Sequence, residues 1–289
     1  MSITDKLKKK KVVADLLGVY LRAQDEFAAS KRDASRIKFL RPSQLPFCPV
    51  GFYVSHATQG MVSTLNMLGA YYTSVGTTVH EVVQKYISPS GRFLADWQCR
   101  QCGKRHRLTT KSECCDFTMD YHEVQINHKG VVGHIDAIFQ DAQGRYWILD
   151  FKTCTVSGSG YKQKSPGATY REQVETYAYM LYKQYGIKVE GVMLMFIPRD
   201  DPTKPTVWVK LVDAKDFKRI GARIKAYKQM HKEALNAETL SEALALAEWG
   251  RCKGDWCKTC KSGLSLKSQL RAAYKRGRQL NHLPLANLK

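Results

Sequence analysis

Two neighbouring apolar segments of the chain, GHIDAIF and ILDFKT, carry charged residues where a core strand normally has none. The segments predict β-strands over 131–140 and 145–155, joined by a hairpin turn at DAQG. Asp136 lies in the first strand, and Asp150 and Lys152 lie two residues apart in the second. Because side chains alternate along a strand, Asp150 and Lys152 share a face, and side-by-side pairing of the strands brings Asp136 toward them.

This grouping of two carboxylates with one ammonium group has two interpretations. One is a partly buried Asp–Lys ion pair. The other is a metal site, since unpaired carboxylates are costly to bury, and carboxylates with a main-chain carbonyl suit Mg²⁺ or Mn²⁺. A cation there would polarise a phosphoryl oxygen, and Lys152 would orient or deprotonate a water molecule.

The chain is strongly basic: 46 Lys and Arg against 26 Asp and Glu give its 289 residues a formal charge of +20. Such an excess favours a polyanionic partner, either nucleic acid or an anionic membrane surface. No apolar run approaches the roughly 18 residues of a spanning helix, and the N-terminus lacks the apolar stretch of a signal peptide. We therefore expect a cytoplasmic protein with no membrane partner, whose nine cysteines serve as metal ligands rather than in disulfides.

Helices are predicted before and after a central sheet along the chain, which indicates an α/β or α+β domain. The helix over 76–87 is expected to place Val79, Val82, Val83 and Tyr86 on one apolar stripe. The other predicted elements are helices over 4–36, 168–186, 214–236 and 238–250, strands over 121–130, 189–200 and 205–213, and a loop over 156–167.

The order Asp, a spacer, then Asp-x-Lys resembles the PD-(D/E)XK nuclease superfamily. Two further segments resemble its RecB-like branch. GTTVHEVVQKYI matches the Gly-x-x-x-His helix of that branch through Gly76 and His80, and REQVETYAYML matches its Gln-x-x-x-Tyr motif through Gln173 and Tyr177. The combined order of these motifs is far more specific than any one of them.

The resemblance implies a role for each matching residue. The implied ligands of Mg²⁺ or Mn²⁺ are His80, Asp136, Asp150 and the carbonyl of Phe151. Lys152 would position the attacking water. Gln173 and Tyr177, four residues apart on one helical face, would line the site and either contact DNA or orient Lys152. Glu123 is a weaker candidate, which either supports the metal or faces solvent.

Cysteines flank this region. Cys48 precedes it, and Cys252, Cys257 and Cys260 follow it, which resembles the iron–sulfur RecB-like nucleases, including the AddB-type and CRISPR-adaptation enzymes. That resemblance implies a [4Fe–4S] cluster tying the ends of the domain together. The spacing C-x₄-C-x₂-C departs from the usual order of gaps, so a Cys₄ zinc site is the alternative.

A second group of cysteines lies in an insert. Cys99 and Cys102 with the following glycine have the form of a zinc-ribbon knuckle, and Cys114 and Cys115 would complete the site. Because adjacent side chains rarely reach one tetrahedral ion, the histidines nearby are alternative ligands: His106 or His122. The insert is basic, so it either touches phosphates or only braces a long loop.

The implied architecture is a restriction-endonuclease-like core with a central mixed sheet flanked by helices. Its expected parts are a helical segment over 1–41, a nuclease domain over 42–262 with the zinc-ribbon-like insert over 97–122 and the cysteine cluster over 252–260, and a basic tail over 263–289.

We therefore expect a metal-dependent DNA nuclease, an exonuclease acting on single-stranded or end-containing DNA. Its expected partners are DNA and recombination, replication or CRISPR-adaptation proteins, and a phage origin is one expectation. Two alternatives remain: a structure-specific or nicking endonuclease, and a non-catalytic DNA-binding accessory protein on the same fold. In two basic segments, Tyr227 and Tyr274 interleave with cations, which suits either base stacking on a single strand or a solvated helix face.

Overall fold

The computed structural model describes residues 39–44, 67–110, 114–115 and 119–236, together with four helical positions near the N-terminus, Leu16, Gly18, Val19 and Ala23. The predicted helix over 238–250, the basic tail with Tyr274, and the cysteines Cys48, Cys252, Cys257 and Cys260 lie outside the described residues. Within the described part of the chain, every helix is too short or too polar to cross a lipid bilayer.

A mixed sheet of seven strands forms the centre of the fold, in the order β2-β1-β6-β7-β8-β9, with β3 pairing on β1. Strands β7 and β8 run parallel, and the other pairs are antiparallel. A separate hairpin consists of β4 and β5. The strands are β1 Phe93–Cys99, β2 Arg105–Thr109, β3 Met119–His122, β4 Val124–His128, β5 Val131–Ile135, β6 Ala137–Gln140, β7 Tyr146–Cys154, β8 Gly191–Pro198 and β9 Thr206–Leu211.

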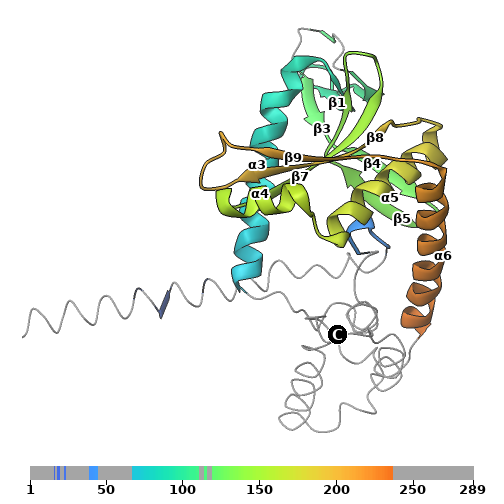
Figure 1. Cartoon of the computed structure of the whole chain (residues 1–289). Coiled ribbons are helices and arrows are strands. Elements are labelled where there is room, and N and C mark those ends of the chain that lie inside the picture. Colours follow the sequence, from blue (N-terminus) through green and yellow to red (C-terminus); the bar gives the residue numbers. More distant parts are fainter. Residues whose placement is uncertain are drawn as a thin grey trace, which may run out of the picture.

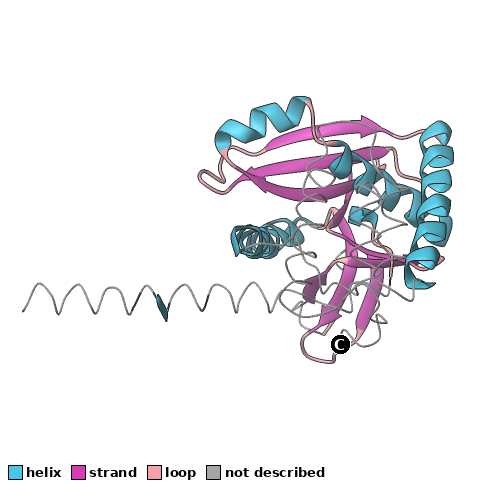
Figure 2. Ribbon diagram, turned by 90° about the horizontal axis from the view of Figure 1, so that it is seen from below, coloured by secondary structure: helices cyan, strands magenta, loops and turns pink. Residues whose placement is uncertain are grey.

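Helices cover both faces of this sheet (Figures 1 and 2). Helix α3 packs on one face, α5 packs on the other, and α6 packs against α5. The buried carboxylate of Glu175 on α5 joins these layers, since it pairs with Lys210 of β9 (2.6 Å) and with Arg219 of α6. The helices are α3 Met67–Ile87, α4 Val156–Lys164, α5 Ala168–Tyr185 and α6 Ala214–Asn236, with short 3₁₀ turns at η2 Pro42–Gln44 and η3 Ser88–Ser90. The predicted mixed α+β class is confirmed.

Strand β7 is buried on both faces, which the alternation in its sequence did not predict. Ile148 lies in the core under α5, although it shares a face with the charged pair. Leu149 and Phe151 lie in a second core under α3. Each fully buried side chain of this size contributes roughly 1.5–3 kcal/mol, so the strand that carries the acids is anchored from both sides.

Two of the predicted strands are interrupted, and both interruptions fall at acidic residues. The predicted strand over 131–140 changes sheets at Asp136, and the predicted strand over 121–130 changes sheets at Glu123. Each prediction of a single continuous strand was therefore wrong. The physical reason is that β4 and β5 pair with each other, while β3 and β6 pair with β1.

Two further local predictions were wrong. The segment after β7, predicted as a loop over 156–167, contains helix α4, because the Thr155 side chain caps its first turn by accepting a hydrogen bond from Gly158 N (3.2 Å). On α3, Val79 and Val83 pack against the core, whereas Val82 and Tyr86 are exposed. The buried positions repeat every four residues, so the predicted stripe was too wide.

A substitution at Gly191, the first residue of β8, tests how closely the sheet packs at this point. A Cβ there would lie 2.3 Å from the Lys210 carbonyl oxygen and 2.7 Å from the Trp147 ring. We expect Gly191→Ala to lower the free energy of unfolding by about 1–3 kcal/mol in urea denaturation. Gly160→Ala is the matched control, since nothing lies within 4 Å of its added methyl group, and it should be neutral or stabilising by about 0.5–1 kcal/mol. Equal unfolding curves for the two variants would contradict this packing.

Candidate active site

Asp136 occupies the point where two hydrogen-bond ladders end. In the β4–β5 hairpin the last pair is Val124 with Ile135, so the next position places Glu123 opposite Asp136. In the β6–β7 pair the last contact is Ala137 with Leu149, so the next position places Asp136 opposite Asp150. The register of two different sheets thus brings three carboxylates to one place.

The backbone and side chain of Asp136 are both held by neighbours. Its carboxylate accepts a hydrogen bond from Phe151 N (2.8 Å), and so replaces the strand partner that this part of β7 lacks. Its carbonyl accepts a hydrogen bond from the Tyr121 hydroxyl (2.6 Å). The residue is only 7% exposed, so its orientation is fixed by the fold.

Asp150 and Lys152 lie beside it on β7. Asp150 Oδ1 accepts a hydrogen bond from Gln173 of α5 (3.1 Å). The other oxygen, Oδ2, is buried and forms an ion pair with Lys152. The Lys152 ammonium also lies over the ring of Tyr170, 5.3 Å from its centre.

Helix α3 supplies His80 from the opposite side. Its Nδ1 lies 3.4 Å from Asp136 Oδ2, and its ring packs edge-on against Phe151. Glu123 completes the group: a ligand atom from each of His80, Glu123 and Asp136 can be chosen so that all three lie within 4.8 Å of one another. Glu123 is held in place by Gln84 (3.0 Å).

Helix α5 contributes hydrogen-bonding side chains to the site. The Gln173 amide bridges Asp150 and the Tyr177 hydroxyl (3.3 Å), where the sequence led us to expect contact with Lys152 or DNA. Tyr177 is buried and packs on Gly133, where an added Cβ would lie 2.7 Å from the ring. Gly133 therefore permits the close approach of α5 to the strand that leads into Asp136.

The electrostatics of the site reflect its burial. Burial, reinforced by the charge of Asp150, raises the pKa of Asp136 well above its usual range. Burial alone lowers the pKa of a lysine, but the carboxylates of Asp150 and Asp136 outweigh that effect and raise the pKa of Lys152. Burial lowers the pKa of His80, which favours the neutral imidazole that binds metals.

These residues fit a hard divalent cation. Asp136 and Asp150 are both buried and repel each other, and a bound cation would offset that repulsion. Carboxylate oxygens, a main-chain carbonyl and an imidazole form a donor set suited to Mg²⁺ or Mn²⁺. The described residues whose ligand atoms lie together are His80, Glu123 and Asp136, and Asp150 and the carbonyl of Phe151 are the further ligands expected from the sequence.

A cavity of about 920 Å³ borders the site. His80 and Glu123 lie in its wall, and the other lining side chains come from α3 and from strands β1 to β5. The cavity therefore reaches the group of His80, Glu123 and Asp136 at His80 and Glu123.

A family model for the PD-(D/E)XK nuclease superfamily matches residues 87–262, more than half of the chain. The chain belongs to the PD-(D/E)XK nuclease superfamily. The matched range includes Asp136, Asp150, Lys152, Gln173 and Tyr177, and His80 lies just before it. The superfamily assignment confirms the first resemblance drawn from the sequence, and it identifies a hydrolytic nuclease fold whose substrate class is DNA and whose members use divalent metals.

Solved structures resemble the chain at low identity. An alkaline exonuclease, LHK-Exo from Laribacter hongkongensis, is 12% identical with a TM-score of 0.42, and the match covers 73% of this chain and 94% of that one. The same enzyme in complex with dAMP gives 12% identity and a TM-score of 0.43, covering 71% and 94%. The protein SSO0001 gives 15% identity and a TM-score of 0.38, covering 73% and 86%. No curated protein matches the chain.

The structure brings together the nuclease-site residues that the sequence singled out, namely His80, Asp136, Asp150, Phe151, Lys152, Gln173 and Tyr177. Sequence reasoning underrated Glu123 and missed Gly133, although an isolated glycine in an apolar strand is a signal of close packing. Tyr227 is buried on α6, so it cannot stack on a base as one interpretation required.

Asp136→Asn tests whether the carboxylates hold a cation. Because burial raises the Asp136 pKa, ionisation of this group costs stability in the metal-free chain as pH rises above about 4, and Asn removes that cost. We expect Mn²⁺ at about 100 times its Kd to stabilise the native chain by about 2.7 kcal/mol, a rise in Tm of roughly 5–10 °C. Asp136→Asn should keep or raise the metal-free Tm and lose the Mn²⁺ response.

The control is Asp201→Asn, which removes a partly exposed carboxylate that lies outside the active-site cavity and should keep the full Mn²⁺ response. A full response in Asp136→Asn would show that the cation binds elsewhere.

Proposed function

We propose that this protein is a divalent-metal-dependent DNA exonuclease that hydrolyses phosphodiester bonds of single-stranded or end-containing DNA. One observation carries the proposal: Asp136, Asp150, Lys152 and His80 converge from three elements beside a cavity that opens to solvent. An ion pair serving stability alone would not require a third carboxylate and an imidazole in the same place.

In this proposal His80, Asp136, Asp150 and the Phe151 carbonyl hold Mg²⁺ or Mn²⁺, and Glu123 supplements them. The bound cation supplies Lewis-acid polarisation of the scissile phosphate and neutralises its charge. The residues of the chain fix the geometry: Gln173 orients Asp150, and the Phe151 amide orients Asp136.

Lys152 acts as a cation in the reaction. Its raised pKa keeps it protonated, so its ammonium group donates hydrogen bonds to the attacking water and to the phosphate oxygens. The water oxygen loses a proton to solvent and forms a bond to phosphorus, the bond from phosphorus to the leaving sugar oxygen breaks, and that oxygen takes up a proton from solvent. The side chain is held over Tyr170 and beside Asp150, which limits its loss of entropy in the reaction.

Burial of the acids supports a preference for strand ends. Asp150 is 1% exposed, and the cavity beside the site is lined by His80 and Glu123 rather than by Asp150. A single strand or a frayed end can enter such a cavity, whereas an intact duplex presents its phosphates on a much wider body. The Gly-x-x-x-His and Gln-x-x-x-Tyr motifs support the same RecB-like assignment.

The terminal cysteines belong to this proposal as a structural element. Cys48, Cys252, Cys257 and Cys260 would close a domain over 42–262 around a [4Fe–4S] cluster, and a Cys₄ zinc ion is the alternative. These cysteines lie outside the described residues, so both their ligand role and the domain limits stay predictions.

Lys152→Met separates catalysis from binding. We expect the substitution to lower the rate of single-turnover cleavage of a labelled oligonucleotide in Mn²⁺ by at least about 10²-fold, because the charge aimed at the reacting phosphate is lost. Its Kd for the same oligonucleotide should change little. Lys183→Met is the control, since Lys183 lies at the far end of α5 and lines a different cavity.

The type of cleavage is tested on matched linear and covalently closed circular single strands. An exonuclease degrades the linear form and leaves the circle intact. Equal degradation of both would replace the exonuclease with an endonuclease, and binding without any metal-dependent cleavage would leave a non-catalytic DNA-binding protein.

A further inference from the structure

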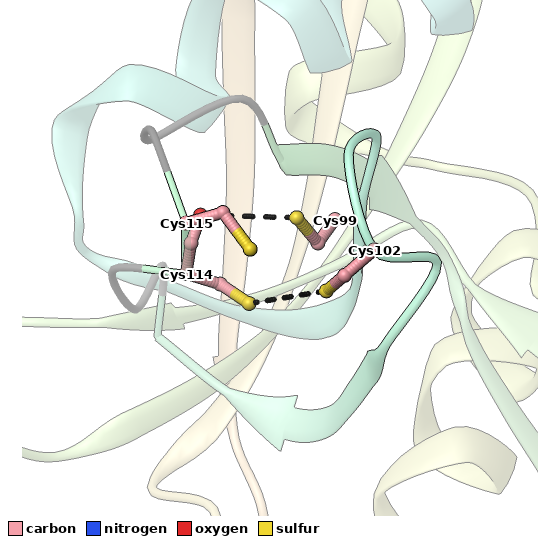
Figure 3. Close-up of side chains that lie close together, drawn as sticks. All are labelled: Cys99, Cys102, Cys114 and Cys115. Carbon is pink, nitrogen blue, oxygen red and sulfur yellow. Dashed lines mark hydrogen bonds between the residues drawn. The ribbon is translucent and has the colours of Figure 1, made fainter.

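Four cysteines outside the active site point toward a common centre (Figure 3). Cys99 ends strand β1, Cys102 lies in the turn that follows, and Cys114 and Cys115 lie beyond β2. A sulfur from each lies within 4.8 Å of the other three, and the sulfurs of Cys102 and Cys114 are 3.7 Å apart.

The backbone conformation explains how the adjacent residues Cys114 and Cys115 can both bind one ion. Cys115 has a φ of +57°, the left-handed conformation that non-glycine residues seldom adopt. This turns the chain so that both neighbouring sulfurs reach the same centre. On the other side, Gly103 has a φ of +70° and its N–H donates to the Cys99 carbonyl (2.9 Å), which closes the tight turn between Cys99 and Cys102.

The spacing of the sulfurs matches a tetrahedral thiolate site. Zinc–sulfur bonds of about 2.3 Å place tetrahedral sulfurs roughly 3.8 Å apart, whereas a disulfide joins them at about 2.05 Å. The alternative ligands from the sequence lie elsewhere: His106 pairs opposite Trp97 in β2, and His122 pairs opposite Asp96 in β3. The candidate ligand group contains the four cysteines and neither histidine.

Strand β1 connects the cysteine cluster to the active site. This strand begins by pairing with β6, next to Asp136, and ends at Cys99. Strands β2 and β3 both pair with β1 near its cysteine end. Trp97 packs against Tyr121 in this extension, and a metal bound at the cysteines would stabilise it further.

Strand β2 presents two arginines to the active-site cavity. Arg105 and Arg107 are two residues apart, share a face and are exposed. Both line the cavity whose wall also contains His80 and Glu123. Arg107 forms an ion pair with Asp96 (3.5 Å). Cations in the cavity wall would bind the phosphates of a DNA strand that enters the cavity.

We propose that Cys99, Cys102, Cys114 and Cys115 bind one zinc ion, which fixes strand β2 so that Arg105 and Arg107 bind the phosphates of DNA entering the active-site cavity. The DNA half of this proposal rests on the proposed function. The zinc half does not, because metal content is measured without any assay of cleavage.

The zinc half is tested on the untagged full chain. Elemental analysis of Cys102→Ser/Cys114→Ser should show one equivalent of zinc fewer per chain than the native protein, whatever metal the terminal cysteines carry. Co²⁺ exchanged into the native chain should give the visible bands of tetrahedral thiolate coordination, and the double variant should lack them. Cys154→Ser is the control, because that buried thiol lies outside the cluster and its loss should leave the metal content unchanged.

The DNA half is tested by binding, in a Lys152→Met background that prevents cleavage. For single strands each phosphate contact contributes a slope of about 0.7 to the dependence of log affinity on log salt, so Arg105→Ala/Arg107→Ala should reduce the slope by about 1.4. Arg145→Ala removes a cation that lies outside this cavity and should leave the slope unchanged. Cys102→Ser/Cys114→Ser should weaken binding in the same direction as the arginine variant.

Each result has one meaning. Unchanged zinc content in the cysteine variant would overturn the metal site. An unchanged salt slope in the arginine variant would show that Arg105 and Arg107 do not bind DNA phosphates, even if the native protein cleaves DNA. A protein that binds through these arginines but never cleaves would overturn the proposed function and leave this inference standing.

Discussion

The hydrogen bond from Phe151 N to the Asp136 carboxylate is the contact on which the site depends. A side chain takes the place of a backbone partner at the point where β5 leaves one sheet and β6 joins another. Because the carboxylate completes a ladder, it cannot turn away without leaving a buried amide unpaired, which costs about 1–3 kcal/mol. The same junction sets Glu123 and Asp150 on either side of it. The fold thus fixes the acids by sheet register.

This junction places the negative charges of Asp136 and Asp150 in a buried region. The Lys152 ammonium offsets part of this charge, and the Gln173 amide and the Phe151 N–H donate hydrogen bonds that position the two aspartates. Such a group of buried acids suits a protein that takes up a cation. Burial, reinforced by the charge of Asp150, raises the pKa of Asp136, and a bound divalent ion would offset this cost of ionisation.

The sequence predicted the parts of the site that depend on local periodicity. Alternation placed Asp150 with Lys152, and helical spacing placed Gln173 with Tyr177. It did not predict that two apolar runs would break at Glu123 and Asp136, since each break depends on which distant strand is the better partner. Adjacent cysteines looked unsuitable as ligands for a similar reason: the left-handed backbone at Cys115 leaves no trace in composition or spacing.

The direct test is a crystal structure of the full chain grown with Mn²⁺ and measured for anomalous scattering at the manganese absorption edge. The account predicts a manganese peak in contact with His80 and with a carboxylate oxygen from each of Asp136 and Asp150. It also predicts that Lys152 remains within hydrogen-bond reach of the open side of the ion. A structure with saturating Mn²⁺ and no peak between these side chains, or with the peak on the exposed surface, would contradict it.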